Sequence, residues 1–156
     1  MSLCEPGPAD AAALAALHVA SWAETYAGLL PVTEIARYGP AFRQAQWARA
    51  LTGCAGRIVW VKDAGFAMMG PQRDEALTTE WPDELYALYF LRRFQGRGPG
   101  RALLDAVRGG PFTATVVAGN TRAEGFYAAA GGVALARRVD VIDDMAVTEV
   151  VLGFAA

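Results

Sequence analysis

A run of closely spaced glycines between a strand-like and a helix-like segment constrains the fold more than any other feature of this chain. Residues 84–91 are apolar and aromatic, as in a buried strand, and residues 101–108 carry apolar side chains on one helical face. Between them, residues 95–100 read Gln-Gly-Arg-Gly-Pro-Gly. Glycines let backbone amides crowd around one anion, and the start of a helix adds the positive end of its dipole. The pattern predicts a strand–loop–helix unit with an anion site at its turn.

Arginine is concentrated in the same segment, at positions 92, 93, 97 and 101, without one acidic residue. The whole chain has 14 basic and 16 acidic residues, a formal net charge of −2, so this concentration favours a phosphate-rich ligand. The simpler alternative is a helix-entry turn with a solvated basic face. Two nucleotide-binding motifs match less well: the glycines at 96, 98 and 100 lack the G-x-G-x-x-G spacing, and the Gly-Lys-Ser/Thr end of a Walker loop is absent.

The order of the expected elements predicts an α+β fold with a mixed sheet covered by helices. No internal repeat or linker interrupts the chain, so we expect one domain over residues 1–156. Thr33 is a candidate N-cap of the second helix. The expected strands are 1–5, 57–62, 66–70, 84–91, 112–118, 133–142 and 145–154, and the expected helices are 8–28, a short one from 31, 42–51, 101–108 and 121–130.

Composition excludes several classes of protein. Hydrophobic residues make up 54% of the chain and charged residues 19%, which excludes a disordered polar chain, and a weakly acidic chain lacks the positive field needed for broad nucleic-acid binding. No apolar run approaches the ~18 residues that span a bilayer, and no basic segment precedes an apolar one at the N-terminus. Cys4 and Cys54 have neither metal-ligand nor disulfide-framework spacing. We therefore expect a cytoplasmic protein with reduced thiols, no metal site, and no nucleic-acid or membrane partner.

Two motifs together carry a family resemblance. The first is Gln95-x-x-Gly98-x-Gly100, and the second is Asn-Thr-Arg-Ala-Glu-Gly-Phe-Tyr-Ala-Ala-Ala-Gly at residues 120–131. They resemble the pyrophosphate-binding motif and the Asn-x-x-Ala-x-x-Phe-Tyr-x-x-x-Gly-Phe signature of the GNAT superfamily of acetyl-CoA-dependent N-acyltransferases. The first helix, at residues 17–28, is also similar to members of that family. The resemblance covers nearly the whole chain and implies a GNAT-type fold, which is a mixed, mostly antiparallel sheet flanked by helices.

The resemblance implies acetyl-CoA as the acyl donor and assigns part of it to each motif. Backbone groups of Leu88, Tyr89 and Phe90 would pair with the pantetheine arm, as an added strand pairs with a sheet edge. Asn120 would contact the cofactor near this arm. A backbone N–H at a bulge near Phe90 would polarise the thioester carbonyl. The residues implied to cradle the pyrophosphate are Gly96, Arg97, Gly98, Pro99, Gly100 and Arg101.

Two positions depart from the family pattern. Pro99 stands where an apolar residue is usual, and a proline fits the first helical turn but removes one N–H. Gly132 stands where a phenylalanine is usual, so a core contact is missing. The segment between the helix after the glycine loop and residue 112 is short, and so is the first hairpin. Both indicate a compact or diverged member of the family.

The resemblance places Tyr127 near the sulfur, where its phenol would protonate the departing thiolate. The alternative is an aromatic side chain that only packs against the sheet. The acid of ribosomal-protein N-terminal acetyltransferases, five positions before the motif asparagine, is replaced here by Thr115, which disfavours that subfamily. Glu84 is the candidate general base, and a solvated charge at a strand start is its equal alternative. Asp83 and Glu80 are weaker candidates for the same role.

The remaining polar aromatic residues are interpreted mainly as packing residues. His18, the only histidine, lies on a helix rich in apolar residues, so we expect it to be packed. Trp22 and Tyr26 could line the acceptor site, although core packing is favoured for Trp22. Trp47 and Trp81 are core or cleft-wall candidates.

The sequence thus predicts an N-acetyltransferase in which a primary amine of a small molecule or peptide attacks acetyl-CoA directly. A non-catalytic CoA-binding module of the same fold is the first alternative, and a general phosphate or nucleotide binder is the second. The sequence leaves open the acceptor, the length of the acyl group and whether the chain forms a homodimer.

Overall fold

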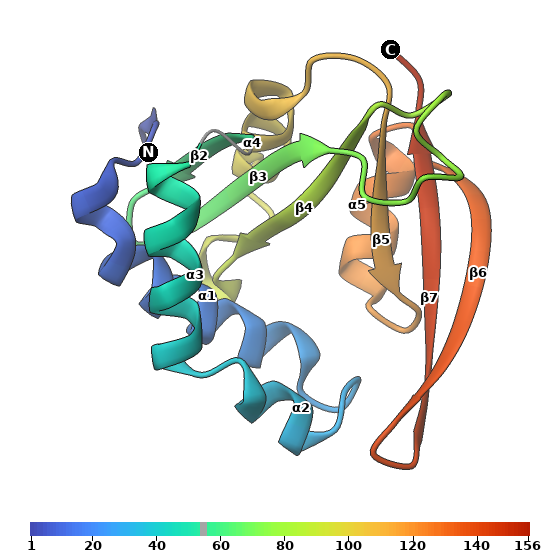
Figure 1. Ribbon diagram of the computed structural model, residues 1–156, viewed down its shortest axis with the longest axis horizontal. Helices are drawn as coiled ribbons and strands as arrows, with labels where there is room; N and C mark the ends of the chain where they lie inside the picture. Colours follow the sequence, from blue (N-terminus) through green and yellow to red (C-terminus); the bar gives the residue numbers. More distant parts are fainter. Residues whose placement is uncertain (54–55) are drawn as a thin grey trace.

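A mixed sheet of seven strands organises the chain, in the order β1–β2–β3–β4–β5–β7–β6 (Figure 1). The computed structural model describes residues 1–53 and 56–156, so Cys54 lies outside the described residues. All neighbouring strands are antiparallel except β4 and β5, which are parallel. The strands are β1 (Leu3–Cys4), β2 (Arg57–Val61), β3 (Gly65–Pro71), β4 (Asp83–Phe90), β5 (Phe112–Val117), β6 (Val133–Ile142) and β7 (Met145–Phe154).

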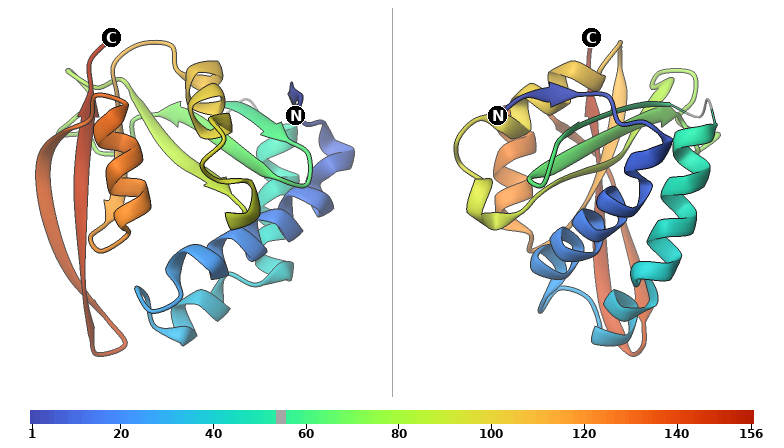
Figure 2. Two further views of the ribbon diagram at one scale, coloured as in Figure 1. Left: turned by 180° about the vertical axis from the view of Figure 1, so that it is seen from behind. Right: turned by 90° about the vertical axis from the view of Figure 1, so that its left-hand side faces the viewer.

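Helices cover both faces of this sheet, as the α+β prediction requires. One face carries the first three helices, and the opposite face carries α4 and α5 (Figure 2). None of the helices in the described ranges is long and apolar enough to cross a membrane. The helices are α1 (Ala11–Tyr26), α2 (Val32–Arg37), α3 (Pro40–Thr52), α4 (Pro99–Val107) and α5 (Thr121–Ala129), with short 3-10 turns η1 (Pro8–Asp10) and η2 (Arg92–Phe94).

A separate apolar layer on each face holds these helices against the sheet. Under α4 and α5, Phe112 and Phe154 are stacked with ring centroids 4.5 Å apart, and both are fully buried. Under α1 and α3, the rings of Trp47 and Phe66 meet edge to face at 5.1 Å. Full burial of such a side chain stabilises the fold by roughly 1.5–3 kcal/mol. The sheet is therefore fixed from both sides.

The parallel strands β4 and β5 pair over a short stretch and then diverge. Their register runs from Asp83 opposite Phe112 to Leu85 opposite Ala114 and stops there. On the other side of β4, the register with β3 shifts between Met68 and Met69, which leaves Tyr86 as the extra residue. Such a bulge bends the strand that carries it. The divergence opens the sheet between the carboxyl ends of β4 and β5.

The bulge prediction near Phe90 is wrong, because the register irregularity lies at Tyr86. Phe90 itself is in regular register with Gly65. A Cβ on Gly65 would lie 2.5 Å from the Tyr89 carbonyl oxygen and from the Phe90 ring, so only glycine permits this close approach. The end of β4 is thereby held flat against β3.

The predicted cap of the second helix is also wrong. The residue at the N-cap of α2 is Pro31, and Thr33 lies inside the helix. The Thr33 hydroxyl donates to the carboxylate of Asp143 in the β6–β7 turn. That turn has positive φ at Asp143 and Asp144, as two-residue hairpins with a type I′ geometry require. Thr33 therefore ties α2 to the closing hairpin instead of capping the helix.

Candidate functional site

A cavity of about 820 Å³ lies where β4 and β5 diverge. Its walls come from β4, from the glycine loop, from the start of α5 and from the end of α1. This volume falls within the range of small-molecule sites. Of the ten residues predicted to bind the cofactor, Arg97 alone does not line the cavity. The residues that do are Leu88, Tyr89, Phe90, Gly96, Gly98, Pro99, Gly100, Arg101 and Asn120.

The glycines of the loop are required for two different reasons. Gly96 and Gly98 have φ of 80° and 85°, in the left-handed region that favours glycine, and a Cβ on either would meet open space. Gly98 is also the N-cap of α4, with Pro99 as its first residue. Gly100 does not have a positive φ, but a Cβ there would lie 3.2 Å from the Phe126 ring of α5. The first two glycines shape the turn, and the third lets α4 start against α5.

The arginines of the predicted basic run have separate roles. Arg101 and Arg92 line the cavity, whereas Arg93 stacks over Phe94 at 4.9 Å. Arg101 pairs with Asp105 at 3.0 Å. Arg92 is anchored to α1, because its N–H donates to a Glu24 carboxylate oxygen at 2.8 Å and its guanidinium to the Glu24 carbonyl at 2.7 Å. Contacts within the protein thus already occupy part of this group of arginines.

Two motif side chains hold the shape of the loop. The Gln95 amide donates to the Phe90 carbonyl at 2.9 Å and accepts from Arg122 at 2.8 Å. Asn120 caps α5, since its Oδ1 accepts from the Ala123 N–H at 3.3 Å. The sequence reasoning missed this cap and missed Arg122 as a cavity residue. The Asn-x-x-Ala spacing at a helix start was the signal for the cap.

One backbone edge of β4 faces the cavity without a strand partner. The pairing with β5 ends at Leu85, and the backbone beyond it continues to Phe90. Backbone N–H and C=O groups form hydrogen bonds wherever a partner is available. The edge at Leu88–Phe90 can therefore accept an extended ligand that carries amide groups, with the Phe90 carbonyl already bound by Gln95.

Four tyrosines line this cavity, and three of them come from different elements. Tyr26 comes from α1, Tyr89 from β4 and Tyr127 from α5, and the hydroxyls of Tyr26 and Tyr89 lie 2.9 Å apart. Burial raises the pKa of each hydroxyl. The Tyr127 hydroxyl has no hydrogen bond to any residue that the structure describes. All three hydroxyls are protonated at neutral pH, and the Tyr127 O–H is available to a ligand.

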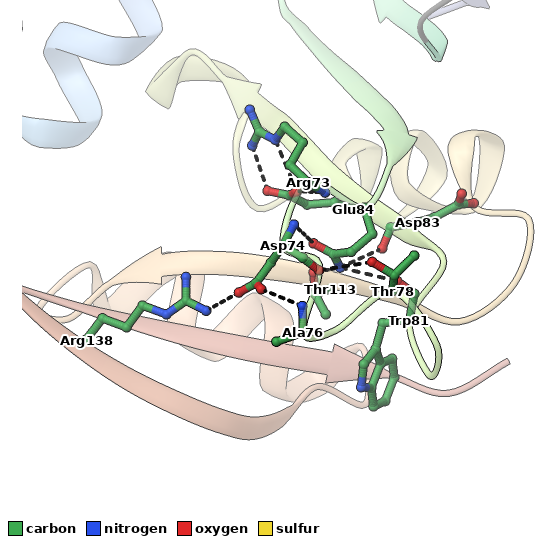
Figure 3. A network of polar contacts seen from close by, with 10 residues as sticks. Arg73, Asp74, Ala76, Thr78, Trp81, Asp83, Glu84, Thr113 and Arg138 are labelled. Carbon is green, nitrogen blue, oxygen red and sulfur yellow. Dashed lines mark hydrogen bonds and ion pairs between the residues drawn. The ribbon is translucent and has the colours of Figure 1, made fainter.

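Glu84, the predicted base, lies elsewhere. It lines a second cavity of about 400 Å³ and does not line the first. Figure 3 shows its carboxylate against Arg73, whose guanidinium donates at 2.6 and 3.1 Å. A third hydrogen bond, of 3.1 Å, comes from the Arg73 backbone N–H. These three hydrogen bonds from Arg73 occupy the carboxylate, so it is not free to bind an acceptor amine.

The other candidate acids do not replace Glu84. Asp83 pairs with Arg57 at 2.8 Å, and Glu80 is exposed in the loop before β4. Asp74 of the same loop binds Arg138 of β6 (Figure 3). Within the described ranges, no group of three or more His, Cys, Asp or Glu residues is placed to hold a metal ion.

The predicted packing roles of the aromatic residues are confirmed. His18 is buried, and it accepts a 3.2 Å hydrogen bond at Nδ1 from the Trp47 indole N–H. Burial, helped by the charge of Arg43, lowers the pKa of His18 to about 3, so the imidazole is neutral. Trp22 packs on Tyr26 at 4.4 Å and does not line the first cavity, whereas Tyr26 does.

Comparisons with known proteins agree with this architecture. No family model matches the chain. The uncharacterized N-acetyltransferase YuaI of Bacillus subtilis (strain 168) is 34% identical over 97 residues, which are 58% of this chain and 53% of that relative. The chain thus spans about half the length of the curated relative.

Two solved structures share the fold across almost the whole chain. A GCN5-related N-acetyltransferase from Rhodopseudomonas palustris has a TM-score of 0.73 and 23% identity, covering 99% of this chain and 95% of that one. YncA from Salmonella typhimurium, a putative acetyltransferase solved with its cofactor acetyl-CoA, has a TM-score of 0.72 and 18% identity, covering 99% and 93%. The chain has the fold of the GNAT N-acetyltransferases. The GNAT-type fold that the two motifs imply is confirmed.

Proposed function

We propose that this chain is an N-acetyltransferase that moves an acetyl group from acetyl-CoA to a primary amine of a small molecule or peptide. The observation that carries the proposal is the first cavity. An unpaired strand edge, a glycine loop at a helix start and an unpaired phenol converge there. These three features correspond to the amide-rich arm, the pyrophosphate and the thioester sulfur of acetyl-CoA. The structural similarity of this chain to YncA, which was solved with acetyl-CoA, supports acetyl-CoA as the donor.

The residues around the cavity fit each part of this donor. Leu88, Tyr89 and Phe90 offer backbone groups to the pantetheine amides. The loop amides at Gly96, Gly98 and Gly100 meet the pyrophosphate beside the N-terminus of α4, where the helix dipole favours an anion. Open space beside Gly96 and Gly98 leaves room for the phosphates. Acetyl-CoA supplies the activated acyl group as a thioester.

Tyr127 acts at the leaving sulfur. Because burial raises its pKa, the phenol holds its proton more tightly than a thiol does, and its main contribution is a hydrogen bond to the developing thiolate. The acceptor amine attacks the thioester directly. The one cysteine that the structure describes, Cys4, is exposed on β1 and lies outside the cavity walls, so no thiol in this part of the chain is positioned to carry the acyl group.

A non-catalytic CoA-binding module is the alternative, favoured by the engagement of Glu84 with Arg73. The two functions are separated by incubating the protein with acetyl-CoA and a panel of amines and measuring free thiol. We expect thiol release that depends on one class of amine. Tight CoA binding without release for any amine would support the module. If ATP displaced CoA at equal concentration, the result would contradict both functions and support a general nucleotide binder.

A further inference from the structure

The carboxylates of the described residues differ in how they are engaged. Eight acidic side chains are partly or fully buried, and seven of them form a hydrogen bond or an ion pair within the protein. Glu149 is the eighth, and it has neither among the described residues. The engaged seven are Asp10, Glu24, Glu34, Asp74, Asp83, Glu84 and Glu124. A half-buried carboxylate without a partner is available to a cation from outside.

Strand register places Glu149 on the sheet face that α1 covers, beside residues that line the two cavities, although Glu149 itself lines neither. Glu149 lies opposite Val117 of β5, and two residues further Val151 lies opposite Thr115. Thr115 lines both cavities, and Val151 lines the second. Side chains two apart on a strand share a face, so Glu149 projects on the same side as these residues.

Tyr26, which lines the first cavity, packs against residues next to this position. Val147, two residues before Glu149, is packed with Val117 and Leu30, and Tyr26 packs against this cluster. The Tyr26 hydroxyl binds that of Tyr89. Burial is the main cause of the raised pKa of Tyr26, and the negative charge of Glu149 adds to it. The carboxylate therefore acts electrostatically on the cavity wall.

We propose that Glu149 is the catalytic base, which binds the ammonium group of the acceptor and takes one proton from it. This role rests on the proposed acetyltransferase function. The amine, approaching over Thr115, then forms the C–N bond at the thioester carbon while the C–S bond breaks. Sulfur leaves with the bonding electron pair. The second proton leaves nitrogen as the amide forms, and it balances the proton that sulfur takes through the Tyr127 hydroxyl. An ammonium ion, a thioester and a carboxylate thus become an amide, a thiol and a carboxylic acid.

The charged and titratable groups around Glu149 come from neighbouring elements. Tyr26 faces it from α1, and Arg138 lies opposite it on β6. The Arg138 guanidinium is bound to Asp74. Arg43 of α3 acts on Tyr26 from the other side. The neighbours on β5, Thr115 and Val117, do not titrate, and neither the tyrosine nor the arginines change charge between pH 5 and 8.

The test compares Glu149→Gln, Glu149→Asp and Glu84→Gln, with Glu5→Gln as a matched change at an exposed residue. Glu149→Gln should lower kcat by ~10²–10⁴-fold, the range for a lost general base, and abolish the acidic limb of the pH profile of kcat/KM. Glu149→Asp should keep that limb with a lower kcat. The melting-temperature rise with acetyl-CoA should be unchanged in all four variants, which shows that each is folded.

The outcomes separate this role from the proposed function. Thiol release by the unmodified protein with an unchanged pH profile in Glu149→Gln would overturn the role of Glu149 alone. If the acidic limb were lost in Glu84→Gln instead, Glu84 of β4 would be the base, and the role of Glu149 would also be overturned. No amine-dependent release by the unmodified protein would overturn the acetyltransferase function, and with it this role.

Discussion

The two cavities of the molecule differ in how far the fold satisfies their polar groups. The opening between β4 and β5 contains a free strand edge and the unpaired Tyr127 hydroxyl. The second cavity is crossed by the Arg73–Glu84 and Arg138–Asp74 pairs, and Gln72 bonds Thr113 inside it at 2.8 Å. A ligand gains most where it supplies missing partners, because paired groups must first give up a hydrogen bond. The first cavity is therefore the binding site that we propose, whereas the ion pairs of the second cavity hold the loop before β4 in place.

The largest effect is expected from Gly98→Asp. The left-handed φ of 85° strains any side chain there, and the added carboxylate repels a pyrophosphate. The melting-temperature rise that acetyl-CoA gives the native protein should disappear. The matched control is Gly125→Ala on α5, where a Cβ meets nothing within 4 Å. An undiminished melting-temperature rise in Gly98→Asp would show that the loop does not bind the pyrophosphate.

Tyr127→Phe should have the next largest effect, on turnover and not on binding. The substitution removes one hydroxyl and keeps the ring that packs on Phe126 and Phe154. We expect kcat to fall by ~10²–10³-fold, as for the loss of one hydrogen-bond donor to charge that develops in the transition state, with unchanged affinity for acetyl-CoA. Steady-state kinetics and calorimetry measure the two quantities separately. A parallel loss of both would mean that Tyr127 is a packing residue.

Glu84→Gln tests whether the second cavity has only a structural role. The Arg73 partner is 65% exposed, so water replaces much of the lost attraction. The free energy of unfolding should fall by no more than ~1 kcal/mol, as for exposed ion pairs. Chemical denaturation checks this value. Weaker binding of acetyl-CoA in this variant would show that the two cavities form one site.

Pro99→Ala is expected to have the smallest effect. Proline pre-sets the first turn of α4 but offers no N–H to an anion. If the neighbouring amides already satisfy the pyrophosphate, calorimetric titration with CoA should give the same Kd for both proteins. Tightening by more than about tenfold, or ~1.4 kcal/mol, would show that the loop is a weakened form of the family's site.

Local patterns were sufficient to predict most of the fold and the loop. The closing hairpin has the predicted bounds, since its two strand-like runs and the Asp143–Asp144 turn lie within one segment. The helix after the glycine loop was predicted at 101–108 and is found at Pro99–Val107, so it starts two residues earlier than predicted.

The errors share a different cause, which is dependence on residues far away in the sequence. Thr33 is drawn to Asp143, and the bulge at Tyr86 is set by pairing with β3. Glu84 meets Arg73 only because the loop before β4 folds back. Glu149 lies opposite Val117 through the β5–β7 register, which a single sequence does not contain.

Hydrogen exchange of backbone amides with and without CoA tests the central claim most directly. The account predicts protection by CoA at residues 88–90, where β4 lacks a partner, and in the loop at Gly96, Gly98 and Gly100. The amides around the second cavity, such as Glu84 and Thr113, should exchange at unchanged rates. Protection at the second cavity, or none at residues 88–90, would contradict the assignment of the β4–β5 opening as the acetyl-CoA site.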